Sequence, residues 1–160
     1  TLTTSDTRIG TRYLSSLAQG PRMVDGAFAI AHGSPLDEDA YIFSDLDALR
    51  VFRGTDFPIC FFGHSHFPVI FALTPDAITT CLTVAPAFRF KLQPGARYLI
   101  NPGSVGQPRD GNPCASFALY DSTKRVVSIH RLAYPLRQAQ RKILRAGLPR
   151  PLADRLAIGR

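Results

Sequence analysis

The first third of the chain alternates between helical spacing and short apolar runs. From Ser5, apolar residues recur at helical spacing until Gly20, and residues 37–51 repeat the pattern after an acidic start that suits a helix N-terminus. Residues 27–31 and 58–62 are uninterrupted apolar runs, which predict buried strands. Because each run leads into a polar loop that contains glycine and histidine, this part has the organisation of an α/β protein with loops at the carboxyl ends of its strands.

The pattern then changes to short β runs separated by turn residues. These runs predict strands, paired as antiparallel hairpins, at 67–73, 78–84, 87–92, 97–100, 115–120 and 125–133. After Pro135, apolar residues return to helical spacing until Gly147, and Pro151 begins a final short helix. The predicted fold class is α/β, with mixed sheets and C-terminal helices.

Length and composition fit one ordinary domain. A chain of 160 residues with 45% hydrophobic residues can bury a sizeable core, which argues against disorder. No stretch approaches the ~20 uncharged apolar residues of a membrane helix, and no signal-peptide pattern opens the chain. Cys60, Cys81 and Cys114 lie in apolar runs without C-x-x-C spacing, so we expect buried, reduced thiols and a cytoplasmic location.

The formal charge of +7 is unevenly distributed along the sequence. Residues 1–123 carry a net charge of −2, whereas residues 124–160 carry +9. A basic C-terminal segment can contact nucleic acid or an acidic partner. The simpler interpretation is a solvated helix face, because net charge governs association rather than fold.

Histidines cluster where two predicted strands end. His32 follows the first apolar run, and Gly63-His64-Ser65-His66 follows the second, whereas His130 lies within a predicted strand. In an extended loop, alternate side chains point to opposite sides, so His64 and His66 would face two neighbouring ions rather than chelate one. A single histidine is more often a hydrogen-bonded structural residue, but three at two strand ends favour a metal site.

A third polar loop, Asn101–Asp110, also follows a predicted strand. Its glycines and prolines make a tight turn whose backbone N–H groups can approach an anion, although a turn between strands needs no function. Arg109 can grip a phosphate or pair with its neighbour Asp110. Asn101, Ser104 and Arg109 are the predicted substrate contacts.

These three loops together resemble the calcineurin-like metallophosphoesterase superfamily. The resemblance rests on Ala31-His32-Gly33-Ser34-Pro35, on Gly63-His64-Ser65-His66 with Pro68, and on Asn101-Pro102-Gly103-Ser104-Val105-Gly106-Gln107-Pro108-Arg109-Asp110, in this order. The ending from Ala146 to Arg160 is also similar, so the resemblance covers essentially the whole chain. It is strongest to the small bacterial phosphodiesterase and protein-phosphatase-like branch.

The resemblance implies a four-layer α/β/β/α sandwich with a dinuclear metal centre at the strand ends. It assigns His32 and His64 to one divalent metal ion and His66 to the other, with Mn, Fe, Zn and Ni all suited to imidazole. It also implies phosphatase or phosphodiesterase activity, in which a metal-activated hydroxide hydrolyses a phosphomonoester or phosphodiester.

The family's N-terminal motifs have no counterpart in this sequence. These are Asp-x-His, Gly-Asp with the bridging carboxylate, and Gly-Asn-His with the general-acid histidine. We therefore expect residues 1–160 to form a single domain that is the C-terminal part of a metallophosphoesterase domain, with the missing motifs upstream of Thr1. No catalytic residue is assigned within the chain, which alone should bind metal partially or not at all and be nearly inactive.

Two functions are weighed on this basis. The first is an incomplete metal-dependent phosphoesterase, whose partners are a phosphate-ester substrate and either the missing N-terminal segment or another copy of the chain. The second is a degenerate, non-catalytic module that binds an acidic partner or nucleic acid through its basic C-terminal tail. The first is favoured because a pure binding module would not need His32, His64 and His66 together. Neither involves a membrane.

Overall fold

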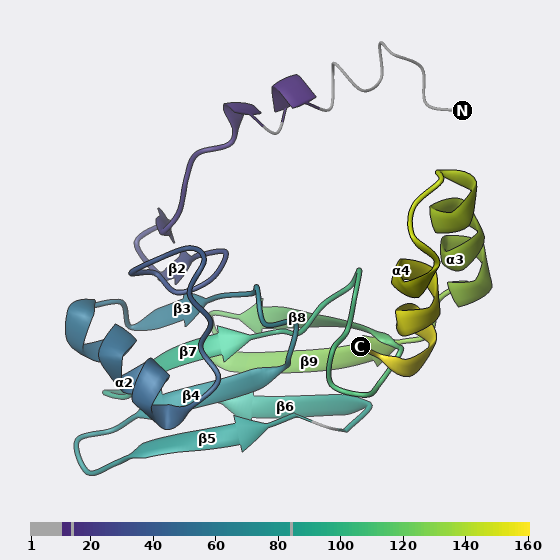
Figure 1. Cartoon of the computed structure of the whole chain (residues 1–160). Coiled ribbons are helices and arrows are strands. Elements are labelled where there is room, and N and C mark those ends of the chain that lie inside the picture. The colour runs from purple at the N-terminus through teal and green to yellow at the C-terminus, as the bar shows by residue number, and fades with distance from the viewer. Residues whose placement is uncertain (1–10, 14, 84) are drawn as a thin grey trace.

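The computed structural model, which describes residues 11–13, 15–83 and 85–160, contains two β-sheets with helices (Figure 1). The larger sheet has the strand order β1-β2-β3-β7-β4-β5. Strands β2, β3 and β7 are neighbours and run parallel, while the remaining pairs in this sheet are antiparallel. Its strands are β1 (Arg22–Val24), β2 (Phe28–Ile30), β3 (Ile59–Phe61), β4 (Val69–Leu73), β5 (Ile78–Leu82) and β7 (Arg97–Asn101).

The smaller sheet is antiparallel and has the order β6-β9-β8. Its strands are β6 (Ala87–Lys91), β8 (Ala115–Asp121) and β9 (Val126–Leu132). The two sheets face one another across a core that Ile70, Tyr98 and Ile100 of the larger sheet share with Val127 and Ile129 of the smaller. The mixed α/β class with two sheets is therefore confirmed.

Both faces of the central strands of the larger sheet are buried. Successive side chains of a strand point to opposite faces, so Leu99 packs on the side of the helix α2 while its neighbours Tyr98 and Ile100 pack against the smaller sheet. Strands covered on both faces become continuous apolar runs, which is why Ile59–Phe61 could be recognised in the sequence.

Helix α2 (Asp45–Gly54) covers the outer face of the larger sheet, but it begins later than the sequence predicts. Its N-cap is Ser44, whose hydroxyl accepts the backbone N–H of Asp47 while the Asp47 carboxylate accepts the N–H of Ser44. This capping box fixes the start of the helix. The acidic residues 37–39, predicted as the helix start, instead lie in turns that precede it.

The C-terminal segment forms helices α3 (Leu136–Arg145) and α4 (Arg150–Asp154), followed by the 3-10 turn η1 (Arg155–Ile158). Helices α3 and α4 lie side by side beyond the ends of β8 and β9 (Figure 1). Arg141 and Arg145 of α3 are exposed, as a solvated helix face requires, and α3 has no buried residue.

Two sequence predictions concern the N-terminus and the cysteines. Of the helix predicted from Ser5, residues 1–10 and 14 lie outside the described part, and residues 11–13 and 15–16 are helical. The strand β1 was not predicted.

The three cysteines are free, but only Cys60 is fully buried, and this burial raises the pKa of its thiol to about 12.

Candidate metal centre

The three motif loops meet at one edge of the larger sheet. His32 follows β2, Gly63–His66 follows β3, and the loop to Asp110 follows β7. Because these three strands are parallel neighbours, their carboxyl ends lie together. The loops thus lie at the carboxyl ends of their strands, as the α/β organisation of the sequence predicts.

His32 and His64 are in direct contact. Nδ1 of His64 lies 3.0 Å from Nε2 of His32, and the two ring centroids are 4.8 Å apart at an interplanar angle of 64°. The backbone N–H of Gly63 donates to the carbonyl of His32 at 2.7 Å, which joins the two loops. Two nitrogens bound to one Zn²⁺ ion at ~2.1 Å would themselves lie about 3.0–3.4 Å apart. The pair therefore has the spacing of two ligands to one ion.

His66 is held in a different way. Its Nδ1 lies 2.7 Å from the carbonyl oxygen of Gln107, and because a carbonyl only accepts, Nδ1 carries the hydrogen. Nε2 is then the nitrogen with a free lone pair, which is the arrangement that a second hydrogen bond imposes on metal-binding histidines. Burial lowers the pKa of His66, as does the nearby charge of Arg109, while the bond to Gln107 opposes the shift.

The loop that carries these histidines is not extended, contrary to the sequence prediction. His64 has φ 63° and His66 has φ 57°, so both lie in the left-handed region. This conformation is uncommon for residues other than glycine and costs of order 1–3 kcal/mol per residue. Such strain persists only where surrounding contacts impose it, and here those contacts come from the loop after β7.

Asn101 supplies these contacts, and a substrate contact by this residue stays a prediction. The residue is fully buried. Its Nδ2 donates to the carbonyl of Gly63 at 3.0 Å and to the hydroxyl of Ser65 at 2.8 Å, and its Oδ1 accepts the N–H of Gly103 at 2.8 Å. With its amide fully used and no exposed surface, Asn101 positions the histidine loop.

Ser104 also shapes its own loop. Its hydroxyl accepts the backbone N–H groups of Gly106 at 3.2 Å and Gln107 at 2.9 Å, which closes a tight turn. The Gln107 carbonyl that binds His66 is thereby held in place. A substrate contact by Ser104 stays a prediction.

Arg109 lies beside His66 and does not pair with Asp110. Its backbone N–H donates to the carbonyl of His66 at 3.3 Å, and its buried Nε has no hydrogen-bond partner in the structure. Asp110 instead forms an ion pair with Arg131 of β9, in which the two side chains are 5% and 2% exposed. The Nε–H of the Arg109 guanidinium is therefore a buried donor without a partner among the described residues, and an anion contact by Arg109 stays a prediction.

Aromatic rings next to the histidines were not anticipated. Tyr41 stacks on His64, with centroids 4.2 Å apart and an interplanar angle of 28°. Tyr41 falls in the helix predicted over residues 37–51, because its spacing from later apolar residues fits a helix. The competing signal was the alternation of Tyr41 and Phe43, which places both rings on one side of an extended segment.

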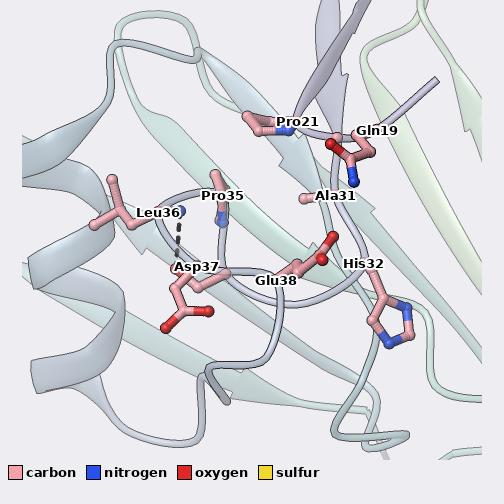
Figure 2. Close-up of a pocket in the computed structure, with 10 residues that line it drawn as sticks. Gln19, Pro21, Ala31, His32, Pro35, Leu36, Asp37 and Glu38 are labelled. Atoms are coloured by element: carbon pink, nitrogen blue, oxygen red, sulfur yellow. Dashed lines mark hydrogen bonds between the residues drawn. The ribbon is translucent and has the colours of Figure 1, made fainter.

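A cavity of about 230 Å³ adjoins His32. Figure 2 shows Asp37 and Glu38 around the same pocket as His32, with Gln19 across from them. These acids follow His32 in the sequence, but the described residues contain no set of three His, Cys, Asp or Glu side chains that could hold a metal ion. The part of the chain seen here thus presents imidazoles without a converging carboxylate.

No helix in the described part of the chain is long and apolar enough to cross a membrane.

Comparison with known proteins places this geometry in context. No family model matches the chain. The sequence is 36% identical over 102 residues to the uncharacterized protein MJ0912 of Methanocaldococcus jannaschii, a match that covers 64% of this chain and 40% of the relative.

Two solved structures share the fold. The crystal structure of a hypothetical protein, PH1004 from Pyrococcus horikoshii OT3, matches 92% of this chain and 53% of its own at a TM-score of 0.64 and 21% identity, which shows the fold alone. The crystal structure of a metallophosphoesterase from Sphaerobacter thermophilus matches 93% of this chain at a TM-score of 0.82 and 37% identity. The chain spans only 60% of that protein. The likeness in fold and sequence to that metallophosphoesterase, together with three histidines at the ends of parallel strands, supports the resemblance to the calcineurin-like metallophosphoesterase superfamily.

Proposed function

We propose that this chain contributes one side of a metal centre that hydrolyses phosphomonoesters or phosphodiesters. The observation that carries the proposal is the convergence of His32 and His64 at 3.0 Å where two parallel strands end. The two imidazoles come from two loops and lie within hydrogen-bond distance of each other, and the same spacing suits two ligands of one divalent ion. The metallophosphoesterase neighbour supports the same reaction class.

The residues divide into distinct roles in this proposal. His32 and His64 would hold one divalent ion, and His66 would offer Nε2 to a second. A bound divalent ion would supply a Lewis acid that polarises the phosphoryl oxygens and lowers the pKa of water. The Arg109 guanidinium, whose Nε is unpartnered, would bind a non-bridging phosphate oxygen and orient the ester.

The donors found here are too few for a complete centre. A zinc site that performs catalysis uses three protein ligands as a rule, whereas His32 and His64 are two. We propose that carboxylate and further histidine ligands come from a segment outside these 160 residues or from another copy of the chain. A cytoplasmic location belongs to the same proposal.

Metal titration of the chain tests the site. We expect weak binding of Mn²⁺ or Zn²⁺, measured by isothermal titration calorimetry, that is abolished by His32→Ala or His64→Ala. His130→Ala is the matched control, because that imidazole stacks on Phe117 in the smaller sheet. Equal loss of binding in the control would remove the assignment.

Turnover measurements test the incompleteness of the centre. The chain alone should hydrolyse bis-p-nitrophenyl phosphate at close to the uncatalysed rate in the presence of excess Mn²⁺. Rapid turnover, or two tightly bound metal ions per chain by plasma mass spectrometry, would contradict the need for further ligands.

A further inference from the structure

A stack of aromatic rings leads away from the histidine loop. The ring centroids of Tyr41 and His64 are 4.2 Å apart. Those of Tyr41 and Phe43 are 5.2 Å apart, and these two rings are nearly parallel, with an interplanar angle of 12°. Three rings thus follow one another from a metal-binding histidine outward. Tyr41 is 44% exposed and Phe43 is 61% exposed, so the outer part of the stack is open to solvent.

The outer end of this stack lines a second cavity. The cavity has a volume of about 350 Å³ and an apolar lining made up of Ile42, Phe43, Phe67, Val69 and Leu82. Phe67 directly follows His66 in the sequence, so the cavity is attached to the histidine loop by both Phe43 and Phe67. Ligand pockets in proteins range from about 300 to 1,000 Å³, so this one can hold a single ring system.

We propose that this cavity, defined by Phe43 and Phe67, binds the planar aromatic group of the phosphate ester whose phosphate lies at His64 and Arg109. The inference rests on the proposed function and names its substrate class: esters that carry an aromatic group, either a nucleobase or an aryl alcohol. Stacked rings favour a further flat ring over a flexible alkyl chain because aromatic pairs gain from offset stacking beyond the area they bury.

The charge of the surroundings agrees with this class of ligand. The side chains that line the cavity carry no charge, whereas Arg109 lies on the His66 side. An ester with an anionic end and an apolar aromatic end matches this polarity in one orientation only. Binding of the aromatic end would then fix the position of the phosphate group relative to the histidines.

Binding of phosphate-free rings tests the cavity independently of catalysis. The 160-residue chain, without added metal, is titrated with adenosine, with 4-nitrophenol and with ribose 5-phosphate, and binding is followed by chemical-shift changes of the Phe43 and Phe67 backbone amides. We expect adenosine or 4-nitrophenol to bind and to shift both amides, and ribose 5-phosphate to leave them unchanged. The first two probes distinguish a nucleobase from an aryl group.

Variants sharpen the test. Phe43→Ala should weaken binding of the aromatic probe about tenfold, because stacking on one aromatic ring contributes a binding free energy of this order. Phe43→Tyr keeps a ring at this position and should retain binding. Leu132→Ala is the matched control, since Leu132 is 60% exposed on β9 and lies outside the cavity lining. It should bind like the parent chain.

The outcomes separate the two proposals. Failure of both aromatic probes to bind, or equal binding by Phe43→Ala, overturns the aromatic site even if metal binding and hydrolysis are found. If the chain binds the aromatic probes but never binds metal, the proposed aromatic site stands and the proposed phosphoesterase function is overturned. Shifts of the same two amides by ribose 5-phosphate would also overturn the proposal.

Discussion

The loops at the strand ends and the C-terminal helices differ in what determines their shape. The histidine loop is held by neutral hydrogen bonds from a buried amide, and the only ion pair at this edge, within the described part of the chain, is the buried one between Asp110 and Arg131. Helices α3 and α4 carry many charges, but these are exposed, and their pair Arg150–Asp154 has side chains that are 80% and 62% exposed. Charge density and functional geometry therefore lie in different regions.

This difference has a practical lesson for interpreting basic chains. The charge excess of residues 124–160 draws attention to the tail and suggests nucleic acid. The geometry of the edge with converging imidazoles depends instead on buried hydrogen bonds, which are stronger in surroundings of low dielectric constant than in water. Substitutions in the two regions test this difference.

The largest effect is expected at the buried ion pair. Arg131→Met leaves the carboxylate of Asp110 buried without a partner, which should lower the free energy of unfolding by about 3–5 kcal/mol. Arg150→Met removes the exposed pair with Asp154 and should cost less than ~1 kcal/mol. Urea denaturation of both variants measures the contrast. Equal losses would show that the two regions do not differ in this way.

A smaller but still large effect is expected at the buried amide. Asn101→Ala removes three hydrogen bonds and leaves the donor of Gly103 and the hydroxyl of Ser65 unsatisfied, so we expect a loss of about 2–4 kcal/mol. The metal affinity of the chain should fall as well, because the loop between His64 and His66 loses its support.

The control for this prediction is Asn112→Ala. That side chain accepts one hydrogen bond, from the N–H of Cys114 at 3.0 Å. Its removal should lower the free energy of unfolding by about 1 kcal/mol without changing metal affinity. A loss of stability in Asn101→Ala with unchanged metal affinity would mean that the amide supports the fold but not the site.

The smallest effect is expected in the tail. Replacing Arg141 and Arg145 together by Gln should change the free energy of unfolding by no more than about 0.5 kcal/mol, since both side chains are exposed. Metal affinity should not change. If the same variant abolishes a salt-sensitive binding of RNA or DNA that the parent chain shows, the alternative of a basic binding module gains support.

The sequence was sufficient to predict most strands and the edge that carries the site. Strand β3 is recognisable because burial on both faces makes it apolar throughout, and β7 because it has a buried apolar centre, Tyr98–Ile100. The motif loops directly follow both strands. The strand β1 was missed since it has three residues, two of them exposed, and thus no hydrophobic pattern.

The details of the site depended on contacts that local patterns do not contain. The left-handed φ of His64 and His66 is imposed by Asn101, which is 35 residues further along the chain than His66. The partner of Asp110 is Arg131 on another sheet rather than its neighbour Arg109. Long-range pairing of this kind follows from the topology, and a spacing rule based on adjacent residues cannot reveal it.

The bond from the Gly63 N–H to the carbonyl of His32 has a consequence for how the protein can vary. It joins two backbones, so side chains elsewhere in the two loops take no part in it. At position 63 itself, a Cβ would lie 3.2 Å from the carbonyl oxygen of His32, and proline would remove the N–H. The spacing of His32 and His64 is therefore buffered against mutation of the surrounding loops. Residues that contact a substrate could diversify among relatives while the distance between the two imidazoles stays the same.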